Sequence, residues 1–277
     1  MLPCALSAKK KNPDLSDSEY YLLAERADSA IKKEDYNLAI DLLEKAMQTE
    51  PGNPGNVLLL SNKGMLHYYI GQDSIALATL NATHQMAPSS VAVLMNRAKI
   101  HNGIGNYADA LVDYTTVTQL DSTLCEAWIQ KGMLQLQGGD VRGAESSLTK
   151  ADDIDNNSKD TMLAWAILYS KTNRPEKAIL YLNKVIKKEK LSEYYAERAL
   201  CRLRIDDLSG AADDIADGLA IDLTNPDLYI ARALLNRRRF REKDAINDAT
   251  TALNHGADPK ILKSWGFEIG NSSRKRN

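Results

Sequence analysis

Residues 94–121 read LMNRAKIHNGIGNYADALVDYTTVTQLD and contain two small residues, Ala98 and Ala110, twelve positions apart. Large apolar or aromatic side chains stand four positions before the first (Leu94) and four positions after the second (Tyr114). Such steps of three and four have the period of an α-helix. Gly105-Asn106 between them is a turn signal. The stretch therefore predicts two helices that cross closely at their small residues.

The same spacing recurs along the whole chain. A first column of small residues has intervals of 37, 34, 34, 34, 33 and 34 residues, and consists of Ala27, Gly64, Ala98, Gly132, Ala166, Ala199 and Ala233. An alanine follows each of them twelve residues later, at Ala39, Ala76, Ala110, Ala144, Ala178, Ala211 and Ala245. A fixed period of this length is typical of a repeat architecture. Seven helix pairs in tandem are predicted.

The two ends of the array differ from its middle, as terminal repeats must. Ser16-Asp17-Ser18-Glu19 matches a capping box, and Asp258-Pro259 matches the start of one more helix. We expect a leader at 1–15, an array at 16–269 and a basic tail at 270–277. The expected repeats are about 20–53, 57–90, 91–124, 125–158, 159–191, 192–225 and 226–259, followed by a cap helix at 259–269. Ile261, Leu262, Trp265 and Ile269 of that helix are expected to cover the last repeat.

The pattern resembles the tetratricopeptide repeat (TPR) over about residues 20–259. The turn Gly105-Asn106-Tyr107-Ala108-Asp109-Ala110 and the repeat end Glu50-Pro51 carry the resemblance. It implies an all-α, right-handed superhelical α-solenoid in which the first helix of each pair lines a concave groove. The last repeat departs from the pattern, because Phe240 replaces the turn glycine amid Arg237, Arg238, Arg239 and Arg241.

Composition argues against several classes of function. A net charge of −2 gives no general attraction to nucleic acid, and no stretch has the roughly 20 apolar residues of a membrane span. Three distant cysteines form neither a disulfide framework nor a metal motif. His67 and His101 share a repeat position but lack further ligands in the sequence. With no catalytic motif either, we expect no enzyme, no cofactor and no nucleic-acid partner.

The candidate site lies on the first helices of repeats two to four. An apolar stripe interrupted by Lys99 runs along these helices, and one position further stand Asn62, Asn96 and Gln130 at intervals of 34 residues. In the TPR family, an asparagine at this place holds the backbone of a bound peptide. The predicted peptide-binding residues are Asn62, Met65, Tyr68, Asn96, Lys99, Ile129, Gln130 and Met133.

These features predict a non-catalytic scaffold that binds a peptide or protein segment in its concave groove. The alternative is a structural building block whose groove is filled by its own N-terminus or by a second copy, as a homo-oligomer. Residues 1–8 resemble the end of an export signal, which favours an exported or periplasmic protein if the true start lies upstream, and a cytoplasmic one otherwise.

Overall fold

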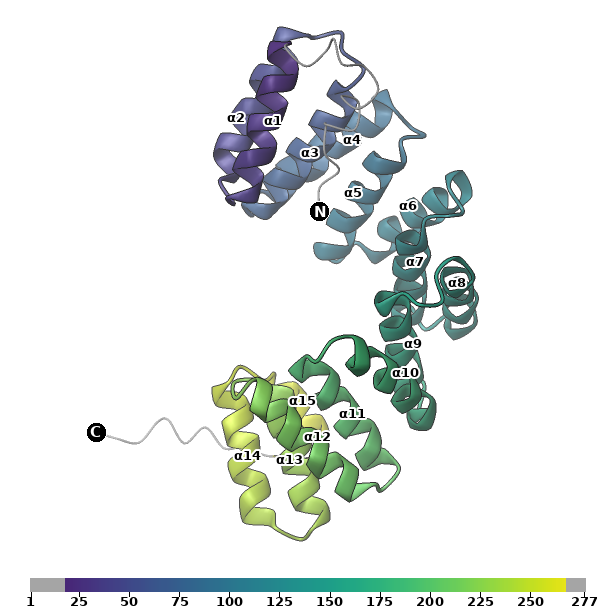
Figure 1. Ribbon diagram of the computed structural model, residues 1–277, viewed down its shortest axis with the longest axis vertical. Helices are drawn as coiled ribbons and strands as arrows, with labels where there is room; N and C mark the ends of the chain where they lie inside the picture. The colour runs from purple at the N-terminus through teal and green to yellow at the C-terminus, as the bar shows by residue number, and fades with distance from the viewer. Residues whose placement is uncertain (1–17, 268–277) are drawn as a thin grey trace, which may run out of the picture. The chain divides into compact units, whose positions relative to one another are not determined.

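The computed structural model describes residues 18–267, which contain fifteen α-helices and no strand (Figure 1). The predicted leader at 1–15, the tail at 270–277 and Ile269 lie outside the described residues. The helices are α1 Glu19–Lys32, α2 Tyr36–Thr49, α3 Asn56–Tyr69, α4 Asp73–Met86, α5 Val91–Gly103, α6 Tyr107–Leu120, α7 Cys125–Gln137, α8 Val141–Ile154, α9 Lys159–Lys171, α10 Pro175–Lys188, α11 Ser192–Arg204, α12 Leu208–Ile221, α13 Pro226–Arg238, α14 Glu242–Asn254 and α15 Pro259–Ser264.

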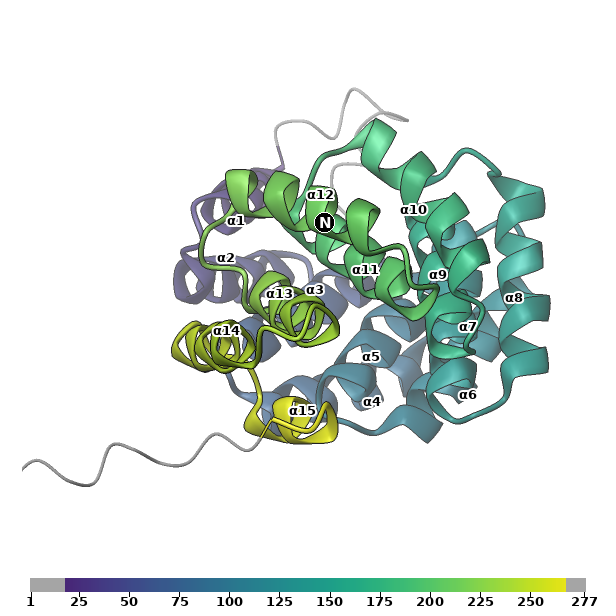
Figure 2. The same cartoon turned by 90° about the horizontal axis from the view of Figure 1, so that it is seen from below.

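The chain divides into two compact units, residues 1–154 and 155–277, here named the N-terminal and C-terminal units. In the N-terminal unit, α1 to α8 form four antiparallel pairs that contact one another through α2 and α3, α4 and α5, and α6 and α7. In the C-terminal unit, α9 to α14 form three pairs, followed by α15 (Figure 2). The prediction of an all-α fold made of seven tandem helix pairs is confirmed.

Both columns of small residues lie in the interior, where the two helices of a pair cross. Every alanine of the two columns is fully buried. A Cβ atom on Gly132 would lie 3.1 Å from Leu148 Cδ2 and 3.3 Å from the backbone oxygen of Ala144. Leu148 is itself fully buried. The small residues therefore let the helices approach, and the large neighbour fills the remaining space.

Each turn within a helix pair contains one residue with a left-handed backbone, seven positions after the first small residue. These residues are Glu34, Gly71, Gly105, Gly139, Asn173, Asp206 and Phe240, with φ between 56° and 86°. A left-handed residue directly after a helix closes the last turn of that helix. Phe240 therefore occupies the place of the turn glycine, as the sequence predicted, and it adopts the same conformation.

Several helix ends are defined by single residues. Pro175 begins α10, and Asp258 caps α15 by accepting a hydrogen bond from the backbone N–H of Lys260. In contrast, α1 begins at Glu19, so Glu19 is not the third helical residue that a capping box from Ser16 requires. The Ser18 hydroxyl instead donates to Glu50 Oε1 at 2.5 Å.

The cap helix is shorter than predicted. It ends at Ser264, and Gly266 (φ +79°) turns the chain so that Phe267 packs against the last pair together with Leu262. Ile261, which was expected to cover that pair, is 45% exposed. The described part of the chain has no helix that is both long and apolar enough to cross a membrane.

Candidate functional site

The predicted site residues lie on three first helices of the N-terminal unit. Helix α3 carries Asn62, Met65 and Tyr68, α5 carries Asn96 and Lys99, and α7 carries Ile129, Gln130 and Met133. Helices α3 and α5 contact each other directly. The 34-residue interval therefore places the residues of one column at the same level of successive pairs, as expected.

The two asparagines are less accessible than predicted. Asn62 is only 2% exposed and Asn96 only 4%. The Asn96 Nδ2 donates to the hydroxyl of Ser61 at 3.0 Å, so this amide links α5 to α3. We therefore expect Asn96→Ala to lower the stability of the fold, because a buried, hydrogen-bonded amide contributes to folding.

Three apolar members of the site also belong largely to the interior. Met65 is 3% exposed and Ile129 is 8% exposed. Tyr68 is half-buried, and its hydroxyl lies so close to Gly103 of α5 that any Cβ there would clash with it. Met65 and Ile129 therefore support the surface from beneath, while Tyr68 keeps part of its ring exposed at the edge.

The accessible part of the site comprises Tyr68, Lys99, Gln130 and Met133, all partly exposed. We call these four residues the first-helix face. Lys99 Nζ forms a 2.9 Å ion pair with Glu126 Oε1, which joins α5 to α7. The face thus offers an amide, a thioether, an aromatic ring and an ion pair, which can bind a polypeptide but form no nucleophile–base pair.

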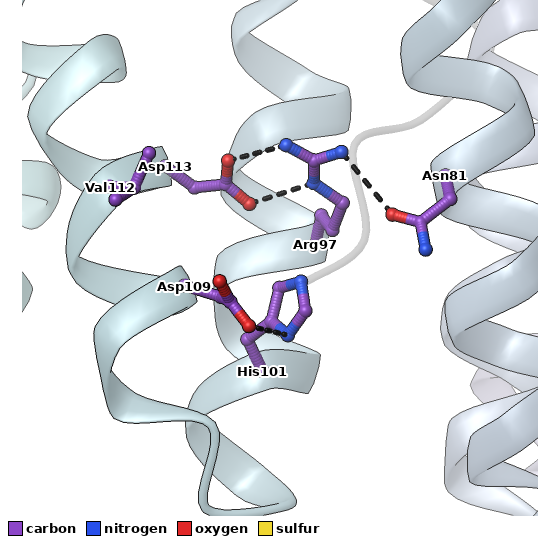
Figure 3. A pocket seen from close by; sticks show the side chains of 6 residues that line it. All are labelled: Asn81, Arg97, His101, Asp109, Val112 and Asp113. Atoms are coloured by element: carbon purple, nitrogen blue, oxygen red, sulfur yellow. Dashed lines mark hydrogen bonds and ion pairs between the residues drawn. The ribbon is translucent and has the colours of Figure 1, made fainter.

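A polar hollow of about 290 Å³ lies elsewhere in the same unit, between α4 and α6 (Figure 3). Arg97 and His101 of α5 line it together with Asn81, Asp109, Val112 and Asp113. Arg97 donates to both carboxylate oxygens of Asp113, at 2.6 and 2.8 Å, and to Asn81 Oδ1 at 3.3 Å. The positive charge is therefore neutralised inside the protein, and the lining contains no serine, cysteine or lysine nucleophile.

The arginine–aspartate pair of this hollow recurs, and sequence reasoning did not find it. Arg198 donates to both carboxylate oxygens of Asp214, and Arg232 donates twice to Asp248 Oδ1, with closest distances of 2.5 and 2.6 Å. The three aspartate side chains are 9% exposed or less. The signal in the sequence is an arginine just before the first small column and an aspartate sixteen residues later.

In the fifth pair, aromatic rings replace these charges. Trp165 stacks on Tyr169 and Tyr181, with centroid distances of 5.3 and 6.1 Å. Trp165 and Tyr181 stand at the positions that the arginine and the aspartate occupy in the third, sixth and seventh pairs. The position is therefore used to join the two helices of a pair, by charge or by stacking.

One cysteine of the C-terminal unit was a further candidate for reactivity. Cys201 is fully buried on α11, and burial raises the pKa of its thiol to about 11. The thiol is therefore protonated at neutral pH and is not an activated nucleophile. Cys125 is partly exposed on α7, and its Sγ donates to the backbone oxygen of Ala151 at 3.6 Å.

The helix pairs and their closely packed small residues define a class of protein, and comparison with solved structures agrees. A tetratricopeptide-repeat protein from Parabacteroides merdae is 24% identical, with a TM-score of 0.72 over 89% of this chain and 96% of that one. One chain of the APC/C hetero-tetramer Cut9–Hcn1 is 14% identical, with a TM-score of 0.65 over 88% of this chain and 54% of that one. The chain therefore has the tetratricopeptide-repeat fold.

Two further likenesses are more limited. YrrB, a TPR protein with an unusual peptide-binding site, is 16% identical, with a TM-score of 0.51 over 68% of this chain and 98% of that one. Superkiller complex protein 3 of Mus musculus is 28% identical over 191 residues, which span 67% of this chain but only 12% of that protein. No family model matches the chain.

Proposed function

We propose that the chain is a non-catalytic scaffold that binds a peptide or protein segment across α3, α5 and α7. The observation that carries the proposal is the first-helix face, where Tyr68, Lys99, Gln130 and Met133 remain partly exposed on neighbouring helices. An adaptable thioether beside an amide and a charged pair suits an extended polypeptide, which needs apolar contacts and hydrogen bonds at once.

In this proposal the exposed and the buried residues of the site have different roles. Gln130 binds the backbone of the segment through its amide, and Met133 contacts an apolar side chain. Asn62, Asn96, Met65 and Ile129 act by holding the three helices in place, because their side chains are buried. The sequence predicted that Asn62, Asn96 and Gln130 all bind the peptide backbone, whereas this proposal keeps that role for Gln130 alone.

The relatives support binding of other polypeptides without identifying one. YrrB has a peptide-binding site, and Cut9 forms a hetero-tetramer with Hcn1. A peptide-binding site on one protein of this fold and an assembly that contains another support the same kind of use for this chain.

The test begins with random linear peptides displayed on phage, selected against the full chain. Calorimetric titration of a selected peptide is expected to show a loss of affinity of about tenfold or more for Met133→Lys, because the substitution places a charge on an apolar contact. Gln130→Ala is expected to weaken binding several-fold. Val112→Lys, at a 63% exposed apolar residue of α6, is the matched control and should bind normally.

Equal affinity of the wild type and both first-helix variants would contradict the proposal. If Met133→Lys instead lowers the thermal midpoint or dissociates an oligomer measured by light scattering, the face is already covered by the N-terminal segment or by a second copy. That result would favour the structural building block over the scaffold.

A further inference from the structure

The turn between α13 and α14 in the C-terminal unit presents a phenylalanine to solvent. Phe240 is 97% exposed, the highest exposure among the large apolar side chains of the described chain. A side chain of this size normally buries much of its area, because exposing it to water is unfavourable. Packing within the chain therefore does not explain this residue.

The backbone at Phe240 adds a second cost. With φ at +59°, Phe240 is left-handed, a conformation that is uncommon for residues other than glycine, asparagine and aspartate and an outlier for bulky ones. Six other turns at this place use glycine, asparagine, aspartate or glutamate. A strained residue that makes no stabilising contact points to a function outside the fold.

Cationic residues flank the phenylalanine in the sequence, on both sides of the turn. Two of these arginines form ion pairs: Arg238 with Asp206 at 3.0 Å, and Arg237 with Glu242 at 3.5 Å. Arg239 donates only to a backbone oxygen, that of Leu208, at 3.3 Å.

Three cations remain without a counter-charge. Among the described residues, Arg239, Arg241 and Lys243 form no ion pair. Only one carboxylate of residues 237–244, that of Asp244, also forms no ion pair with a described residue. The tip therefore has an excess of positive charge around one aromatic ring.

The neighbouring turn contributes to the same surface. Arg238 and Arg239 tie the α13–α14 turn to the α11–α12 turn through Asp206 and Leu208. Ile205 of that second turn is 39% exposed. The tip thus combines Phe240 and Ile205 with uncompensated arginines, and we call these residues with Lys243 the Phe240 tip.

We propose that the Phe240 tip binds the surface of an anionic lipid bilayer, with Phe240 inserted among the acyl chains and the cations at the headgroups. The geometry favours a bilayer over a protein pocket. A stable protein interface needs a broad, complementary surface around its anchor, whereas Phe240 projects from a turn with 97% of its surface exposed. A lipid bilayer is fluid, so a single projecting ring can insert into it without a preformed pocket. Its anionic headgroups attract nearby positive charge.

The test is sedimentation of the full chain with vesicles at low ionic strength. Phosphatidylcholine–phosphatidylglycerol vesicles are compared with vesicles of phosphatidylcholine alone. Binding is expected for the anionic vesicles and is expected to fall about tenfold for Phe240→Ala, which removes the inserted ring. Replacing Arg239 and Arg241 by glutamine should reduce it by a similar factor. Phe240→Trp should retain binding.

Leu180→Ala is the control, because Leu180 of α10 is 61% exposed in the same unit but lies outside the tip. It should sediment like the wild type, and circular dichroism should show all variants folded. The inference is overturned if the wild type ignores anionic vesicles or if Phe240→Ala binds them equally well. Phe240-dependent binding to poly-glutamate, without vesicle binding, would also overturn it and indicate an acidic protein instead.

Discussion

The arginine–aspartate pairs matter most at the scale of single residues. Asp113→Asn removes the charge that neutralises Arg97, whose side chain is only 16% exposed. Leaving a buried cation uncompensated is expected to cost about 3 kcal/mol of unfolding free energy, measured by urea denaturation. Asp109→Asn, at a 66% exposed carboxylate of the same hollow, should cost less than about 0.5 kcal/mol. Equal losses for both variants would contradict this assignment.

The left-handed turn residues permit a reciprocal experiment. Phe240→Gly is expected to raise the unfolding free energy by about 1 kcal/mol, because glycine adopts this conformation without strain. Gly105→Ala, at φ +86° with nothing within 4 Å of the added Cβ, should lower it by about the same amount. Thermal unfolding of both variants checks the signs. A destabilised Phe240→Gly would mean that the phenylalanine does stabilise the fold.

The surroundings of His84 predict that the N-terminal unit loses stability in acid. Burial, followed by the nearby charge of Arg97, lowers the pKa of His84, while Asp113 opposes the shift. The folded state therefore prefers neutral imidazole, so this stabilisation is complete above the unfolded pKa of about 6.5. It is lost as the pH falls below that value through the folded pKa. Denaturation midpoints at several pH values should decline less steeply in acid for His84→Gln than for the wild type.

At the scale of helix pairs, the crossing of α7 and α8 is the sharpest test of the packing. Gly132→Leu is expected to destabilise by about 1–3 kcal/mol, because Leu148 and the Ala144 backbone leave no space for a side chain. Ala144→Leu should behave alike. Gly138→Ala is the control, since its Cβ would meet only ordinary contacts at 3.5 Å or more.

Amide hydrogen exchange shows which helices Gly132→Leu destabilises. Repeats interact with their neighbours, so amides of α7 and α8 should lose protection first in Gly132→Leu. Amides of the C-terminal unit should exchange as in the wild type. Uniform loss of protection along the whole chain would show that the helix pairs do not behave as separate packing layers.

Much of the arrangement of helices could be predicted from the sequence, because the two columns of small residues mark the positions where paired helices cross. The helix pairs follow from residue size, and the turn at Phe240 follows from its position seven residues after Ala233 in the repeat. The burial of Asn96 could not be predicted, because it depends on the Ser61 hydroxyl 35 residues away. The end of α15 was missed because Gly266 stops the helix before the apolar pattern ends.

The candidate site was predictable in position but only partly in detail. The 34-residue interval brings α3, α5 and α7 together, and Gln130 and Met133 do keep exposed surface. Which members of a stripe face a neighbouring helix depends on small differences in side-chain direction that periodicity does not resolve. The arginine–aspartate column was overlooked because charged residues are usually taken as solvent-facing.

At the scale of the whole molecule, the central claim is that the chain binds a polypeptide on the first-helix face. Nuclear magnetic resonance of the methionine methyl groups tests it directly, with a peptide selected on the full chain as the probe. The methyl signal of Met133 is expected to shift and saturate with peptide. Met86, which is 63% exposed on α4, and Met162 of α9 should stay unchanged. Shifts confined to Met86 or Met162, with Met133 unmoved, would contradict the account.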